Sequence, residues 1–310
     1  MKKLISGTTA YAVFSGDIKS ERVSHAYMLH FQDAENMREV LKLFALKFFG
    51  AEESDPDGKR ILNETFSDLH VFPEEGKKFT VESANALLSE CAMRPLERDK
   101  KLIIICGFNE LSPLVQNKLL KTLEEPFEGV HFLLGATSLS PVLDTVKSRV
   151  KGLTISPFTE DEIYSALERK ASNPLNRAAA QSCGGILGVA QNMVSGGWFA
   201  EVSEAAKEIC TTNEAGRIGE VAIRYGEIKY KSELLSAIAA NYHRALCECV
   251  KGEPKGEVAS CFEVPALIYA GWRADKACRD LKFNAFFQGL LYDLMLQIIE
   301  ENDKWLKLRG

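Results

Sequence analysis

Two short runs of almost wholly apolar residues, separated by one helix, constrain the fold more than any other feature of the sequence. The runs are Lys101–Cys106 and Val130–Leu134. Their length and unbroken apolar character are typical of strands that are buried on both faces, as parallel strands are. Between them, Ser112 and Pro113 supply an N-cap and a first-turn proline for a helix that ends before Pro126. A strand, a helix and a second strand in this order predict right-handed parallel crossovers and an α/β fold.

After Pro157 the pattern becomes helical throughout. Thr159–Glu162 forms a capping box, and only helical patterns follow it. A chain of 310 residues is long enough for two or three domains. We therefore expect an α/β base at residues 1–156, a small helical lid at residues 157–198 and a larger all-α domain at residues 199–310.

The composition narrows the class of protein. The sequence is 46% hydrophobic and 26% charged, which is typical of a globular protein. Its net charge of −5 argues against a broad basic surface for DNA. No apolar run is long enough to span a membrane and the start does not favour export, so we expect a cytoplasmic protein. The eight cysteines form no C-x-x-C pair, which favours buried thiols over a metal site.

A phosphate-binding loop is expected between Gly16 and Gly50, but the sequence has no glycine there. The segment Ser24–Phe31 predicts the strand that enters the loop, and a helical pattern follows it. Such a loop needs glycines, because successive backbone N–H groups must wrap an anion, and it needs a lysine for the phosphates. Met37 stands at the lysine position, and Asp33 adds negative charge. We infer that this loop has lost its nucleotide.

The sequence N-x-L-L-K-x-L-E-E-P at Asn117–Pro126 resembles a motif of bacterial clamp-loader subunits. Three further segments resemble elements of the same family in the same order. They are the first-strand entry at Ser24–Tyr27, the S-R-C element at Thr145–Val150 and the lid helix at Cys183–Gly185. On these residues the chain resembles the AAA+ clamp-loader family, and within it the delta-prime subunits of bacterial DNA polymerase III. The resemblance implies an AAA+ parallel-sheet base, a small helical lid and a C-terminal helical collar domain.

Several departures from the family concern the nucleotide site. The Walker B acids fall on Cys106-Gly107 and Asn109, which cannot hold magnesium as carboxylates do. The sensor after the next strand falls near Ala136, and the sensor arginine of the lid falls on Val189. The segment Glu52–Leu69 has no cysteine, so the zinc module of many relatives is missing. The resemblance therefore implies a subunit without a nucleotide cofactor or a metal of its own.

Arg149 is the exception, because the S-R-C arginine of the family reaches the ATP of a neighbouring subunit. The resemblance implies that Arg149 is an arginine finger in trans, with Ser148 in support. A planar guanidinium suits the charge that spreads over the γ-phosphate oxygens in the transition state. Val150 replaces the usual cysteine, which changes packing more than chemistry. The alternative is a surface arginine that pairs with Asp144 or Glu125.

Lys118 and Lys121 lie on the polar side of the helix that carries the N-x-L-L-K-x-L-E-E-P motif. They keep this helix solvated, or they face DNA or a neighbouring subunit. The sequence leaves both readings open.

These features predict a delta-prime-like subunit without intrinsic activity. It would join gamma/tau-like ATPase subunits and a delta-like subunit in a ring that loads a sliding clamp on primed DNA, within a holoenzyme that has DNA polymerase activity. Three alternatives stay open: a divergent ATPase, a delta-like clamp opener or other AAA+ interaction protein, and direct binding to duplex DNA. The acidic total argues against the last of these.

Overall fold

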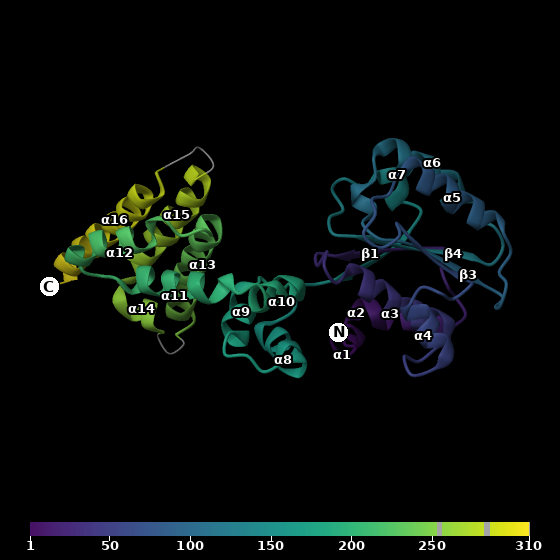
Figure 1. The fold of residues 1–310 in the computed structure, drawn as a ribbon, viewed down its shortest axis with the longest axis horizontal. Coiled ribbons are helices and arrows are strands. Elements are labelled where there is room, and N and C mark those ends of the chain that lie inside the picture. The colour runs from purple at the N-terminus through teal and green to yellow at the C-terminus, as the bar shows by residue number, and fades with distance from the viewer. Residues whose placement is uncertain (253–255, 282–285, 310) are drawn as a thin grey trace. The chain divides into compact units, whose positions relative to one another are not determined.

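The structure, a computed structural model, describes residues 1–252, 256–281 and 286–309 (Figure 1). The chain forms two compact units. The first contains Met1–Ser172 and Cys183–Gln191, and the second contains Asn173–Ser182 and the described residues from Asn192 onward. The three-domain division at residues 156 and 198 stays a prediction.

A five-stranded parallel sheet forms the centre of the first unit. Its order is β2-β3-β4-β1-β5, with β1 at Ala26–Phe31, β2 at Leu69–Phe72, β3 at Lys101–Ile105, β4 at Val130–Ala136 and β5 at Lys151–Ile155. Leu29 of β1 lies opposite Gly135 of β4 and Leu153 of β5. Every residue of β3 is buried, because helices cover both faces of the sheet. The buried parallel strands predicted from the two apolar runs are confirmed.

Helices lie on both faces of this sheet. Figure 1 shows α5 (Val81–Ala92), α6 (Pro113–Glu124) and α7 (Asp144–Lys147) on one face. The other face carries α1 (Lys2–Ser6), α2 (Thr9–Lys19), α3 (Met37–Phe49) and α4 (Pro56–Leu62). A 3-10 helix at Phe108–Glu110 follows β3, and α8 (Glu160–Lys170) follows β5. This is the layered α/β arrangement that the alternating pattern predicts.

Local sequence signals place α6 and α8 as expected. Ser112 accepts a hydrogen bond from the Val115 N–H at the start of α6, and Pro113 occupies the first turn. Thr159 and Glu162 form the capping box of α8. Val115 is buried with Leu119 and Leu123 on the α6 stripe that packs on the sheet.

The turn before β4 depends on a glycine. Gly129 has φ +76°, a conformation that side chains with a Cβ rarely adopt. A Cβ at Gly129 would also lie 2.8 Å from the carbonyl oxygen of Asp99. Both the positive φ and the close approach disfavour any other residue at Gly129, so space and backbone conformation together set this turn.

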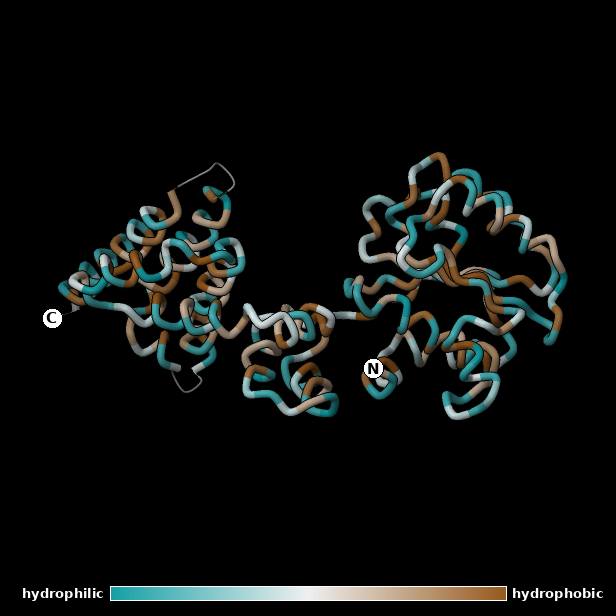
Figure 2. The backbone as a smooth tube through the Cα atoms, viewed as in Figure 1, coloured by the Kyte–Doolittle hydropathy of each residue, from teal (hydrophilic) through white to brown (hydrophobic). Residues whose placement is uncertain are grey.

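The second unit is helical in its described residues, as expected. It contains α9 (Asn176–Ser182), α11 (Trp198–Thr211), a 3-10 helix at Ala215–Arg217, α12 (Ile218–Gly226), α13 (Lys231–Lys251), α14 (Glu257–Cys261), α15 (Val264–Asp280) and α16 (Phe287–Arg309). α10 (Leu187–Ser195) begins in the first unit. Helices α11 to α16 share one hydrophobic core. Figure 2 shows hydrophobic and hydrophilic residues alternating along these helices, as amphipathic helices require.

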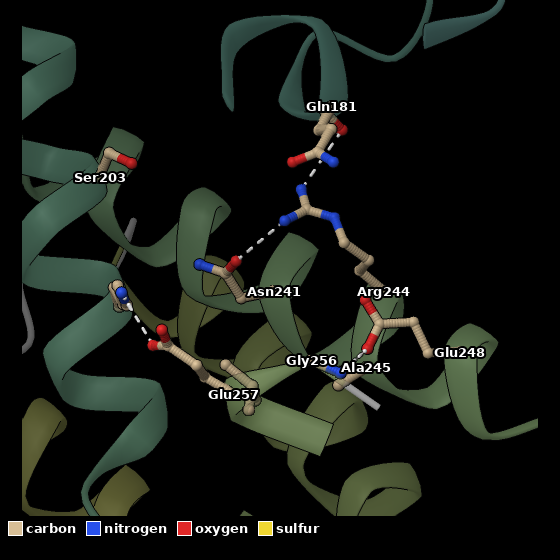
Figure 3. A pocket seen from close by; sticks show the side chains of 10 residues that line it. Gln181, Ser203, Asn241, Arg244, Ala245, Glu248, Gly256 and Glu257 are labelled. Atoms are coloured by element: carbon tan, nitrogen blue, oxygen red, sulfur yellow. Dashed lines mark hydrogen bonds and ion pairs between the residues drawn. The ribbon is translucent and has the colours of Figure 1, made fainter. Parts of the chain in front are cut away.

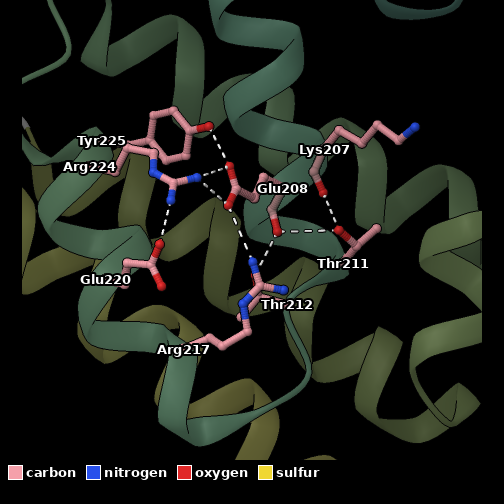
Figure 4. Close-up of polar contacts among 8 residues, drawn as sticks. All are labelled: Lys207, Glu208, Thr211, Thr212, Arg217, Glu220, Arg224 and Tyr225. Atoms are coloured by element: carbon pink, nitrogen blue, oxygen red, sulfur yellow. Dashed lines mark hydrogen bonds and ion pairs between the residues drawn. The ribbon is translucent and has the colours of Figure 1, made fainter.

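One polar cluster joins α11 to α12 in the second unit (Figure 4). The Glu208 carboxylate accepts hydrogen bonds from the Tyr225 hydroxyl at 2.6 Å and from Arg224 Nη1 at 2.7 Å. The hydrogen bond from Tyr225 and the charge of Arg224 lower the pKa of Glu208. The positive and negative charges of the cluster compensate one another, so we infer that the cluster stabilises the helical unit.

Candidate functional site

The carboxyl ends of β1, β3 and β4 meet at one edge of the sheet, beside the place where the strand order reverses. Open α/β sheets bind ligands at this place. The loop without glycines connects β1 to α3, and Cys106 and Thr137 directly follow β3 and β4. The structure therefore brings together the segments that the sequence assigned to a nucleotide site.

Met37 lines a cavity at this edge, but it cannot act as the lysine of a phosphate-binding loop does. It begins α3 and is only 3% exposed. A Cβ placed on Gly135 of β4 would lie 2.7 Å from Met37 Sδ, so the thioether packs directly on the strand. A buried thioether offers neither charge nor a hydrogen-bond donor to a phosphate.

Asp33 lies inside the β1–α3 loop and is 1% exposed. Its carboxylate accepts hydrogen bonds from the backbone N–H of Asn36 at 3.1 Å and from Asn36 Nδ2 at 2.7 Å. It also accepts one from the backbone N–H of Gly188 at 2.8 Å. The sequence placed a negative charge here but gave no sign of the partner in α10.

Arg38, the second residue of α3, is the first cation after the loop in the sequence, and it is already paired. Its Nε donates to Glu64 Oε1 at 2.7 Å and its Nη1 donates to the Pro73 carbonyl at 2.8 Å. Burial alone would raise the pKa of Glu64, but the hydrogen bond and charge of Arg38 outweigh burial and lower it. Sequence reasoning missed this pair, because its partners are separated by a helix and a loop.

The end of β3 carries no carboxylate in the Walker B position. Burial raises the pKa of the Cys106 thiol to about 11, so the thiol stays protonated at neutral pH. Asn109 Nδ2 donates to Thr137 Oγ1 at 3.1 Å, and the Thr137 N–H donates to Asn109 Oδ1 at 2.9 Å. The Asn109 side chain thus binds both the backbone N–H and the hydroxyl of Thr137, across the ends of β3 and β4.

A cavity of about 210 Å³ remains at this edge, and its wall is acidic. Glu75 and Glu110 line it, together with Arg38 and Lys77. Lys77 is bound to Glu74 at 2.6 Å, as Arg38 is bound to Glu64. Both cations on the wall are therefore compensated, and the cavity does not suit a triphosphate.

Arg149 follows α7 and is held by neighbours of its own chain. Its Nη1 donates to the Thr145 carbonyl at 2.7 Å and to Ser148 Oγ at 3.1 Å, and its Nη2 forms an ion pair with Glu124. The Arg149 side chain is 34% exposed and that of Glu124 is 42% exposed. The structure thus brings Ser148 to Arg149 as the sequence suggested. The carboxylate partner is Glu124 and not Asp144 or Glu125.

Comparison with known proteins shows which proteins the first half of the chain is similar to. A protein-family model described as "DNA polymerase III, delta subunit" matches residues 7–159. The DNA polymerase III subunit delta' of Bacillus subtilis is 31% identical over 163 residues, which are 51% of this chain and 50% of that protein. The subunit delta' of Haemophilus influenzae is 30% identical over 106 residues, which are 34% of this chain and 32% of that protein.

Over residues 7–159 the chain matches the DNA polymerase III delta-subunit family, and over about half of its length it is similar to delta-prime subunits. It spans half or less of the length of these two relatives. A solved structure of a DNA polymerase III gamma subunit-related protein of Thermotoga maritima is 15% identical and has a TM-score of 0.44. That comparison covers 94% of this chain and 99% of the other. The strand order of the first unit is that of an AAA+ base, as the resemblance implied.

Lys118 and Lys121 are the two remaining candidate residues from the sequence analysis. Lys118 Nζ donates to Asn85 Oδ1, so it joins α6 to α5. Lys121 is exposed, and within the part of the chain that the structure describes its side chain forms no hydrogen bond or ion pair. Lys121 is therefore the freer of the two to meet DNA or another subunit.

No group of three or more His, Cys, Asp or Glu side chains among the described residues could hold a metal ion. Within the same residues, no helix is both long and apolar enough to cross a membrane.

The second unit has a pocket that the sequence did not indicate (Figure 3). Its volume is about 280 Å³, and polar side chains line most of it. The Lys207–Glu257 ion pair crosses one side at 2.8 Å, and Glu248 accepts the Gly256 N–H at 2.9 Å. Arg244 Nη2 reaches the Gln181 carbonyl at 3.4 Å. Because opposite charges on the wall are balanced, we assign the pocket no ligand.

Proposed function

We propose that this chain is a delta-prime subunit that works in a DNA polymerase III clamp loader without hydrolysing ATP itself. The observation that carries the proposal is the family match over residues 7–159, which include Arg149 and the N-x-L-L-K-x-L-E-E-P helix α6. In this role the chain supplies Arg149 in trans, with Ser148 in support, and a docking surface for its partners. Polymerase activity belongs to the holoenzyme that contains the loader.

The absence of a competent site in the chain itself supports the non-hydrolysing role. Met37 is buried, the cavity wall is acidic, and Cys106 and Asn109 stand where magnesium ligands are needed. Hydrolysis of ATP requires cations and magnesium around the phosphates at the same time. At this edge Arg38 and Lys77 are already paired with carboxylates, and Cys106 and Asn109 offer magnesium no carboxylate, so we assign the chain no nucleotide or metal cofactor.

The surroundings of Arg149 support a finger that can move. An ion pair between half-exposed side chains, such as Arg149 and Glu124, contributes about 0–1 kcal/mol. The guanidinium can therefore leave Glu124 at little cost when a triphosphate of a neighbouring subunit offers a stronger partner. Arg149 directly follows Ser148, the C-cap of α7, and its backbone N–H donates to the Val146 carbonyl at 2.9 Å, which holds the backbone while the side chain extends.

The partners follow from the family and are part of the proposal. We propose a cytoplasmic hetero-oligomeric ring with gamma/tau-like ATPase subunits and a delta-like subunit, which acts on a sliding clamp and reaches primed DNA through the complex. The helical second unit would serve as the collar that joins the ring. Lys121, and Lys118 if it releases Asn85, would face DNA or a neighbouring subunit.

Reconstitution tests this function. The chain is purified with the gamma/tau-like and delta-like subunits and the clamp of its own organism. We expect a stable complex that loads the clamp on primed DNA with ATP, and loss of loading when this chain is omitted. A complex that forms and loads clamps equally well without it would overturn the proposal.

Calorimetric titration distinguishes the non-hydrolysing subunit from the alternative of a divergent ATPase. We expect no heat of binding when ATP and Mg²⁺ are added to the isolated chain, and micromolar affinity would favour the ATPase. Purification of the clamp with this chain alone, without ATPase subunits, would favour a delta-like opener instead.

A further inference from the structure

The buried carboxylate of Asp33 has an arrangement of donors that resembles an anion site. Two backbone N–H groups point at it, from Asn36 at 3.1 Å and from Gly188 at 2.8 Å, and Asn36 Nδ2 adds a third donor at 2.7 Å. Backbone N–H groups at helix starts bind phosphate in the same way. Here the anion is a side chain of the same loop.

The two N–H groups come from places where a donor is otherwise unsatisfied. Asn36 is the N-cap of α3, and Gly188 is the second residue of α10. The first N–H groups of a helix have no partner within the helix, and both residues are buried. The positive ends of two helices therefore meet one carboxylate, which electrostatics favours.

The fit around the carboxylate leaves no room for a side chain at Gly188 of α10. A Cβ placed on Gly188 would lie 2.3 Å from Asp33 Oδ1 and 2.7 Å from Glu35 Cβ. Asn36 Nδ2 also donates to Gln191 Oε1 at 3.2 Å, which is a second link to the same helix. Val189, the position assigned to the sensor arginine, is 38% exposed.

We propose that Asp33 is an internal anion that takes the place of a bound phosphate. Its carboxylate occupies the donors of Asn36 and Gly188, and it fixes the segment Cys183–Gln191 to the β1–α3 loop without any nucleotide. The position of this segment is then independent of ATP. The inference concerns contacts within the first unit, so it can be tested on the isolated chain, separately from the role in a clamp loader.

Hydrogen exchange on the isolated full-length chain tests this proposal. In the wild type, the Gly188 amide should be protected equally with and without Mg-ATP. Asp33→Ala should raise exchange in the β1–α3 loop and in Cys183–Gln191, by on the order of tenfold or more at Gly188, because a charge-assisted hydrogen bond is lost. Glu35→Ala is the matched control, since it removes an exposed carboxylate of the same loop.

Chemical rescue makes the test specific. Formate can enter the space that Asp33→Ala leaves, so sodium formate should restore protection at Gly188, whereas sodium chloride at equal ionic strength should not. Formate should change nothing in the wild type or in Glu35→Ala.

Three results would overturn the proposal: unchanged exchange at Gly188 in Asp33→Ala, raised exchange that formate does not reverse, or protection in the wild type that depends on Mg-ATP. If Asp33→Ala does not fold, Asp33→Asn decides. It keeps the shape and loses the charge, so exchange at Gly188 should rise by a smaller factor, and unchanged exchange would refute the role of the anion.

Discussion

Replacement of Arg149 by alanine distinguishes a catalytic role from a structural one, because the expected loss of hydrolysis rate is much larger than the expected loss of folding stability. In the free chain the guanidinium is held by Glu124, the Thr145 carbonyl and Ser148 Oγ, all near the surface. Contacts of this kind contribute about 0–1 kcal/mol to folding. For a protein of this size, such a loss lowers the melting temperature by no more than about 2–4 °C.

The expected catalytic effect is much larger. An arginine finger contributes on the order of 10³–10⁵ in rate in small GTPases, which corresponds to about 4–7 kcal/mol of transition-state stabilisation. Breaking the Glu124 contact to reach the neighbour takes back at most about 1 kcal/mol of this. Arg149→Ala should therefore leave assembly intact and slow hydrolysis at the one ATP site that it faces by at least about a hundredfold.

The assay must resolve that one site, because other subunits keep their own fingers. Phosphate release is followed over the first turnover of a reconstituted loader with clamp and primed DNA, and the phase from the neighbouring site should disappear. Arg149→Lys should behave almost as poorly, since an ammonium lacks the planar fork. Lys147→Ala is the matched control, because it removes a cation that lies two residues before Arg149 and contacts Asp144. Normal phosphate release from an intact Arg149→Ala complex would refute the reasoning.

Three further predictions follow from the described contacts. Glu208→Gln should lower the melting temperature at pH 7 but not near pH 3. The Tyr225 hydrogen bond lowers the pKa of Glu208 below 4.5, so the ionised carboxylate stabilises the folded state above that pH, and this stabilisation is lost as the pH falls. An equal difference in melting temperature at both pH values would contradict this. Lys101→Met should lower the melting temperature. The ammonium of Lys101, which is 1% exposed, donates to the Glu90 carbonyl at 3.1 Å and lies 3.8 Å from Glu90 Oε2, and the substitution removes the partner of both groups. An unchanged melting temperature would show that these contacts are not needed. Met37→Lys should not restore ATP binding in calorimetry, because the anion position is already occupied and the cavity is acidic; micromolar binding would refute that account.

Much of the first unit could be predicted because its signals are local. A run of buried apolar residues, an N-cap with a proline and a capping box each lie within a few residues, and β3, α6 and α8 formed where these signals stand. Strand β2 was missed, since it has four residues at the sheet edge and three of them are only half-buried. A short edge strand carries too little periodicity to be recognised.

The sequence by itself determined the parallel α/β base, the helical second half, the family and the loss of glycines and lysine from the β1–α3 loop. Only the tertiary structure decided what replaced them. Asp33 and Gly188 are 155 residues apart, and Arg149 meets Glu124 rather than the two acids that the sequence suggested. The physical reason is that a carboxylate takes its role from the donors around it, and those donors come from segments that only folding brings together.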